Sequence, residues 1–71
     1  MKISFTYHAR IRILERNIKI SHIRQVLKKP DYQSPTYENA IQARKKVGDQ
    51  NLEIIYKKTI NKIVIITLYY L

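Results

Sequence analysis

The hydrophobic positions follow a helical period up to Pro30 and a period of two after Glu38. Two stripes with helical spacing occur in the first part: Tyr7, Ile11, Leu14 and Ile18, then Ile20, Ile23, Val26 and Leu27. We expect a first helix that is capped by Ser4 or Thr6 and ends at Asn17, a residue that tolerates the left-handed conformation. A second helix should begin at Ser21 or as early as Lys19. It should stop before Pro30, because a residue that precedes proline is disfavoured in a helix. The stripe with Tyr7 and Leu14 is expected to pack on the rest of the domain.

Three strands are predicted in the second part of the chain, over residues 39–47, 52–57 and 62–70. The turn between the first two contains Gly48, the only glycine in the chain. The last strand is apolar on both sides and is expected to be the central one. Residues 31–38 are rich in Pro, Ser, Asp and Tyr and read as a loop. Residues 2–5 fit either a short strand or a lead-in.

These elements predict a single α+β domain over residues 1–71, with two N-terminal helices packed on an antiparallel β-meander of three to four strands. A chain of 71 residues has room for one small core. The absence of cysteine excludes disulfides and thiolate metal sites, and two histidines with five scattered acidic residues form no metal-ligand cluster. We expect neither a metal nor a cofactor.

The formal net charge of +9 and the pI near 10.1 predict a partner that carries negative charge. Such a field attracts phosphate backbones or acidic proteins. A membrane surface fits less well, because the apolar residues follow core-forming periods rather than one long basic amphipathic helix. No signal peptide and no apolar run of membrane-spanning length is visible, so a cytoplasmic location is expected.

An imidazole and two guanidinium groups on the first predicted helix form a candidate site. His8, Arg12 and Arg16 are spaced i, i+4 and i+8, which places them on one helix face beside the apolar stripe. Their donors can converge on one anionic group without a loop folding around it. A solvated surface explains such a stripe equally simply, and from these residues alone it is the commoner case.

A second cluster, Arg44, Lys45 and Lys46, lies on the first predicted strand, with Arg44 and Lys46 on one face. These cations fit either phosphate binding or a charged strand edge that discourages aggregation. Thr67 interrupts the apolar last strand, and β-propensity alone explains it. Tyr69 and Tyr70 fit half-buried packing residues or rings on which RNA bases stack.

Taken together, three motifs resemble a small prokaryotic family of toxin-like domains of unknown function. They are His8-Ala9-x-x-Arg12-Ile13-x-x-Arg16-Asn17-Ile18, then Ile23-x-x-Val26-Leu27-x-x-Pro30-Asp31, and the terminal Ile66-Thr67-Leu68-Tyr69. The resemblance covers nearly the whole chain, and the helix motif is its most specific part. The sequence departs from the usual pattern in having Asn17 for glycine, Ile13 for methionine and Lys19 at the cap of the second helix.

That family is similar in fold to RelE-like and barnase/EndoU/colicin ribonucleases. The resemblance therefore implies a metal-independent RNA-cleaving or RNA-binding site. Its motif positions fall on His8, Arg12, Arg16, Thr67 and Tyr69, and less securely on Arg44 or Lys46 for a strand cation. Family resemblance does not establish catalysis, since function belongs to a site and not to a fold.

Two functions remain open at this stage. The first is an RNA endonuclease of the toxin–antitoxin type that acts through the substrate 2′-hydroxyl, with His8 as the titrating group and RNA contacts from Arg44, Lys45 and Lys46. The second is a non-catalytic basic module that binds RNA or another protein through the same fold. RNA is the expected partner in both, and an acidic antitoxin protein is a candidate partner.

Overall fold

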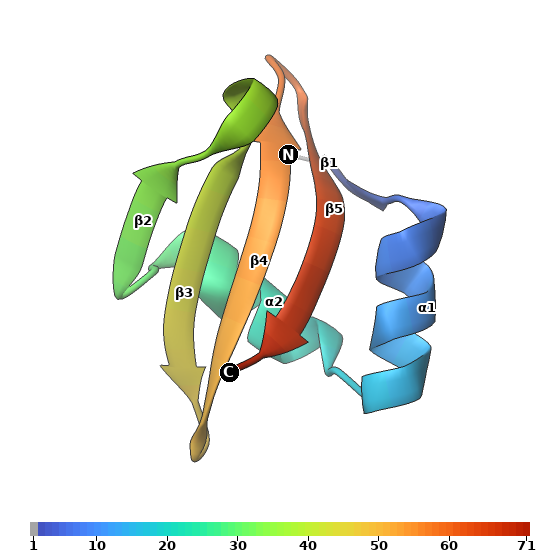
Figure 1. Ribbon diagram of the computed structural model, residues 1–71, viewed down its shortest axis with the longest axis vertical. Helices are drawn as coiled ribbons and strands as arrows, with labels where there is room; N and C mark the ends of the chain where they lie inside the picture. Colours follow the sequence, from blue (N-terminus) through green and yellow to red (C-terminus); the bar gives the residue numbers. More distant parts are fainter. Residues whose placement is uncertain (1) are drawn as a thin grey trace.

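The computed structural model describes residues 2–71 as two helices and a five-stranded mixed sheet (Figure 1). In chain order the elements are β1 (Lys2–Phe5), α1 (Tyr7–Arg16), α2 (Ile20–Lys28), β2 (Tyr32–Pro35), the 3-10 turn η1 (Tyr37–Asn39), β3 (Ile41–Val47), β4 (Gln50–Lys58) and β5 (Lys62–Tyr70). The predicted α+β class is confirmed. The predicted count of three to four antiparallel strands is wrong.

The strand order is β1-β5-β4-β3-β2, and β1 runs parallel to β5 while the other pairs are antiparallel. Two of the five strands were not predicted as such, because residues 2–5 fitted either a strand or a lead-in and residues 31–38 were expected to form a loop. Residues 2–5 pair with residues 62–65, and Tyr32–Pro35, inside the expected loop, pairs with the first half of β3. Both added strands lie at the edges, so β4 is central and not β5 as expected.

The start and end of α1 are fixed by local hydrogen bonds. The Thr6 hydroxyl oxygen accepts from the Ala9 backbone N–H at 3.1 Å, so Thr6 and not Ser4 is the N-cap. The same hydroxyl donates to the Ile66 carbonyl at 2.7 Å, which ties the helix start to β5. Asn17 adopts φ 52° and ψ 48°, the predicted left-handed conformation.

The second helix begins at Ile20 with Lys19 as its N-cap, the earlier of the two predicted starts. Lys19 makes no side-chain capping bond, so this end depends on packing instead. Ile23 and Val26 are fully buried against the sheet. The helix ends at Lys28, before Pro30, as predicted.

The packed face of α1 differs from the predicted one. Tyr7 and Leu14 are 80% and 81% exposed, whereas Ala9 is fully buried and Ile13 packs against the core. The reason is topological: β1 leads into α1 alongside β5, so the helix lies at the side of β5 (Figure 1). A helix at a sheet edge packs closely through a small residue such as Ala9. Tyr7 and Leu14 of the predicted stripe therefore turn outward, whereas Ile11 is half-buried and Ile18 is buried in the core.

The two faces of the sheet differ in character. One face packs against α2 and carries the core, which includes Ala43, Leu52, Ile54 and Leu68. The alternating positions on the same strands belong to the opposite face, which we call the open face. No helix within residues 2–71 combines the length and the apolar character needed to cross a membrane.

Candidate nucleic-acid interface

A row of four polar and aromatic side chains crosses the open face. The strand register pairs Tyr32 with Arg44, Arg44 with Glu53, and Glu53 with Tyr69, so one residue from each of β2, β3, β4 and β5 lies in line. Residues directly opposite one another on adjacent strands have their Cβ atoms about 5 Å apart and interact. We call Tyr32, Arg44, Glu53 and Tyr69 the polar row.

Glu53 is the centre of the polar row and is only 3% exposed. Its Oε1 accepts hydrogen bonds from Arg44 at 2.9 and 2.7 Å and from the Gln42 amide at 2.9 Å. Its Oε2 accepts a hydrogen bond from the Tyr69 hydroxyl group. A buried carboxylate with this many donors is satisfied and paired, so it carries no free negative charge on the open face.

Arg44 contacts an aromatic ring as well as the carboxylate. Its guanidinium carbon lies 5.2 Å from the centre of the Tyr32 ring, within the range of a cation–π interaction. The Arg44 side chain keeps 38% of its surface exposed, and Tyr32 is 49% exposed. The polar row therefore presents an accessible guanidinium and an accessible ring side by side.

The hydrogen bonds of the polar row shift two pKa values in opposite directions. Burial by itself would raise the pKa of Glu53. The hydrogen bonds from Tyr69, Gln42 and Arg44 outweigh burial and hold this pKa below its ordinary value. The hydrogen bond to Glu53, with a smaller contribution from burial, raises the pKa of Tyr69. At neutral pH Glu53 is thus ionised and Tyr69 holds its proton.

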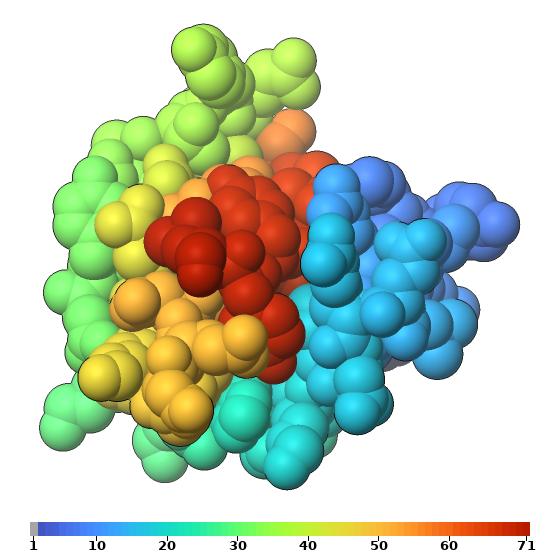
Figure 2. All heavy atoms as spheres, turned by 60° about the horizontal axis from the view of Figure 1, so that its bottom comes forward, coloured from blue at the N-terminus to red at the C-terminus, as the bar shows by residue number. Residues whose placement is uncertain are grey.

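A hollow of about 300 Å³ lies next to the polar row, between the end of α1 and the end of β5. Arg16, Gln50, Tyr69 and Tyr70 line it. Figure 2 shows the last residues of β5 directly beside α1 on this side of the molecule. The hollow joins a cation of the predicted helix stripe to a tyrosine of the predicted strand motif.

The rest of the predicted helix stripe lies along the same side of β5. His8 is exposed near the start of α1, Arg12 is half-buried in its middle, and Arg16 is exposed at its end. Two residues eight positions apart in a helix are separated by about 12 Å along its axis. His8 and Arg16 therefore mark two ends of a strip rather than one compact pocket, and only Arg16 lines the hollow with Tyr69.

Thr67 and the strand cations lie at separate places. Thr67 is half-buried on β5 opposite Ile55, on the open face with Tyr69. Lys46 is exposed two positions from Arg44 on the same face, as predicted. Lys45 belongs to the other face, and its ammonium group contacts the Asp31 carboxylate at 3.3 Å. The three cations therefore do not form one cluster.

A family model of a domain of unknown function matches residues 5–70, which includes all the residues of this interface. The chain belongs to the DUF4258 family. The comparison with curated proteins and the comparison with solved structures gave no match. The predicted membership in a family of small domains of unknown function is thereby confirmed.

Glu53 is the member of this DUF4258 interface that sequence reasoning missed. It occupies the run Leu52-Glu53-Ile54-Ile55-Tyr56, where it is the one charged residue in an apolar strand of a strongly basic chain. A lone carboxylate at such a position must be paired or neutral once the strand is buried. That argument would have pointed to a cationic partner on the neighbouring strand.

The described part of the DUF4258 domain contains no metal-ligand cluster: residues 2–71 hold no group of three His, Cys, Asp or Glu side chains that could bind an ion.

Asp31 lies outside the polar row. The Lys46 backbone N–H, at 3.0 Å, and the Lys45 ammonium group lower the pKa of Asp31. Its contacts hold the start of β2 against β3.

Proposed function

We propose that this DUF4258 domain is a metal-independent RNA endonuclease of the toxin type, with a RelE-like ribonuclease fold, that acts in the cytoplasm. The observation that carries the proposal is the strip of cations and tyrosines along β5. On one side it has His8, Arg12 and Arg16 of α1, and on the other it has the polar row. The central carboxylate of the polar row, Glu53, is neutralised by Arg44.

The composition of this strip favours a single-stranded nucleic acid. Exposed rings beside cations, such as Tyr32 beside Arg44, stack bases without sequence preference while the cations contact phosphates. Lys46, two positions from Arg44 on β3, and Arg16, at the end of α1, are exposed and add positive charge. The net charge of +9 attracts the phosphate backbone at long range.

Cleavage through the 2′-hydroxyl needs a proton acceptor, a proton donor and cations that stabilise a pentacoordinate phosphorus. In the proposed step the 2′-oxygen loses its proton and attacks phosphorus, the bond to the 5′-oxygen breaks, and that oxygen takes up a proton. His8 is the one side chain of the helix stripe whose type serves as a general acid or base, because arginine stays protonated. Arg12 supplies charge at the scissile phosphate beside His8, and Thr67 positions that phosphate. Arg16 and Tyr69, at the other end of α1, contact a neighbouring phosphate of the same strand.

The first test measures cleavage of a labelled RNA in excess EDTA, beside the same oligonucleotide with a 2′-deoxy substitution at the scissile position. We expect the RNA to be cut and the deoxy substrate to resist. His8→Ala should lower turnover by about 10² to 10⁴, the usual contribution of a positioned acid or base. Tyr7→Ala, at the exposed neighbouring position, is the matched control and should cleave like the parent.

Three results would reject the mechanism: cutting of the deoxy substrate, loss of activity on chelation, or a fully active His8→Ala variant. Affinity for RNA should stay within a few fold in His8→Ala, because the variant removes chemistry rather than the binding surface. A parallel loss of affinity and turnover would instead place His8 in binding.

The second test measures RNA affinity as a function of salt. Affinity should fall on a log–log plot with a slope of about −0.7 for each phosphate contacted. Lys46→Ala should weaken binding without changing base preference and should reduce the slope, and Arg44→Ala should do so as well. Lys58→Ala, an exposed lysine at the end of β4, is the matched control. Affinity that is absent at low salt or flat with salt contradicts RNA binding.

One observation favours a non-catalytic module as the second candidate. The Tyr69 hydroxyl already donates to Glu53, and its pKa is raised, so it is a poor source of the second proton. RNA binding without cleavage under any condition would select this function. In either case an acidic antitoxin is a candidate partner, since it would meet the basic surface with complementary charge.

A further inference from the structure

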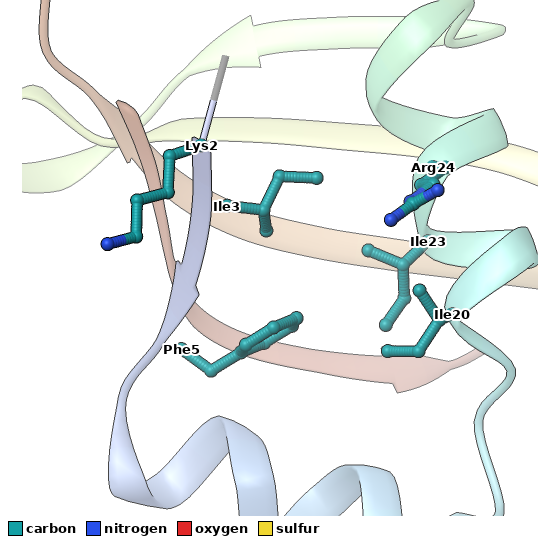
Figure 3. Close-up of a pocket in the computed structure, with 6 residues that line it drawn as sticks. All are labelled: Lys2, Ile3, Phe5, Ile20, Ile23 and Arg24. Atoms are coloured by element: carbon teal, nitrogen blue, oxygen red, sulfur yellow. The ribbon is translucent and has the colours of Figure 1, made fainter. Parts of the chain in front are cut away.

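A groove separates β1 from α2 on the face of the sheet against which α2 packs. Its volume is about 490 Å³, and it is lined by Lys2, Ile3, Phe5, Ile20, Ile23 and Arg24. Figure 3 shows the side chains of Ile3 and Phe5 extending from β1 toward those of Ile20 and Ile23 on α2. The groove lies away from the open face and from the polar row.

The walls of the groove are apolar and only partly covered. Ile23 is fully buried at its floor, Ile3 and Phe5 are half-buried, and Ile20 is 45% exposed. A second hollow lined by Leu27, Lys28 and Ile63 continues from it along α2. Contiguous apolar surface with a polar rim is typical of a binding site for another chain.

The groove borders an unpaired strand edge. β1 is the last strand of the sheet, and its partner β5 lies on one side only. The backbone N–H groups of Lys2 and Thr6 donate toward β5, to Asn61 and Ile65. Alternate residues of a strand direct their N–H and C=O groups to opposite sides, so those of Ile3 and Phe5 point away from the sheet. Within residues 2–71 no strand pairs with this side of β1, so these groups form a short row of free donors and acceptors.

The charges around the groove are all positive. Lys2 and Arg24 are exposed at its rim, and Lys28 is exposed beside the neighbouring hollow. Neither hollow is lined by an acidic residue among residues 2–71. An occupant with apolar side chains toward the groove and carboxylates at the rim would be complementary to this surface.

We propose that the free edge of β1 binds an extended segment of an acidic protein in which apolar and acidic residues alternate. The segment adds a sixth strand, pairs with the backbone of Ile3 and Phe5, and places its apolar residues against Ile20 and Ile23. A helix is disfavoured in this position because it would cover the edge groups of β1 without offering them hydrogen bonds. This site is separate from the proposed RNA site and does not depend on it.

The test uses a synthetic capped peptide of four Val-Glu repeats and ¹⁵N-labelled protein. We expect binding, with chemical-shift changes and slower hydrogen exchange at the Ile3 and Phe5 amides. The same peptide with lysine in place of glutamate should not bind. Of two further peptides, N-methylated at all valines or at all glutamates, the one that loses the N–H groups facing β1 should fail to bind.

Two charge-reversal variants separate this site from the RNA surface. Arg24→Glu should weaken peptide binding by about fivefold while RNA affinity changes little. Lys46→Glu makes the same change in net charge on the open face, so it should leave peptide binding near the parent value and weaken RNA binding. The proposal is overturned if the acidic peptide does not bind, if both N-methylated peptides bind like the parent peptide, or if Ile3 and Phe5 amides are unaffected.

Discussion

Replacing Glu53 by glutamine tests the polar row most directly. The variant keeps the size of the side chain and one acceptor oxygen but removes the negative charge that Arg44, Gln42 and Tyr69 share. Hydrogen bonds that involve a charged group contribute about 1.5–3 kcal/mol each. Arg44 and Tyr69 are partly exposed, so in the variant water replaces part of their lost hydrogen bonding. The free energy of unfolding should therefore fall by only about 2 kcal/mol, near the low end of that range.

A loss of this size is large for so small a domain. A chain of this length has a total stability of roughly 4–10 kcal/mol. A change of 1 kcal/mol shifts the melting temperature of a domain this small by about 4–8 °C, so Glu53→Gln should melt roughly 8–16 °C lower. The measurement is thermal and urea unfolding by circular dichroism at pH 7. Glu15→Gln, an exposed carboxylate on α1, is the matched control and should change stability by less than about 0.5 kcal/mol.

The contribution of Glu53 to stability should depend on pH in a defined direction. Because the folded-state pKa of Glu53 is lowered, its contribution is complete above the unfolded-state pKa of about 4.3 and is lost as pH falls through the folded-state pKa. The difference between parent and Glu53→Gln should therefore be constant from about pH 6 to pH 8 and shrink below about pH 4. A difference that is absent at pH 7, or one that grows on acidification, would refute the account of the polar row.

Two further predictions concern single hydroxyl groups. The pKa of Tyr69 should lie above the ordinary tyrosine value of about 10, and the stability that its hydroxyl contributes should be lost as pH rises through that raised pKa. Ultraviolet titration of the parent and of Tyr69→Phe measures this pKa. An unshifted pKa would contradict the hydrogen bond to Glu53. Thr6→Val removes both the cap of α1 and the bond to Ile66, so it should cost about 2 kcal/mol in urea unfolding. Thr36→Val is its control, since the Thr36 side chain makes no capping bond to η1; equal stability of the two variants would contradict the role of Thr6.

The features that sequence predicted correctly depend on residues near one another in the chain. The cap at Thr6, the left-handed end at Asn17 and the stop before Pro30 each involve contacts within one helical turn. The turn at Gly48, with φ 65°, likewise follows from a residue that adopts positive φ without strain. These features can be predicted because each group bonds to a partner at a fixed, short separation along the sequence.

The errors arose where a distant partner decides the outcome. β2 has weak strand propensity and ends at Pro35, and it forms because β3 offers an edge with which it pairs. The packed face of α1 was ambiguous because apolar residues occur on several sides, and the position of the helix beside β5 selected Ala9 over Leu14. The parallel pairing of β1 with β5 joins residues about sixty positions apart, which no local pattern reports.

The candidate site shows the same division. The helix cations and Tyr69 were identified from their motif, but the residue that organises the polar row, Glu53, was not, because its importance depends on the register between β3, β4 and β5. A well-packed apolar residue at this position could be as stable as the buried ion pair. What the carboxylate adds is orientation, since it holds Arg44 beside the Tyr32 ring and fixes the Tyr69 hydroxyl. The pairing also cancels much of the charge of Arg44, so the exposed cations Arg16 and Lys46 are the ones best able to contact a phosphate backbone.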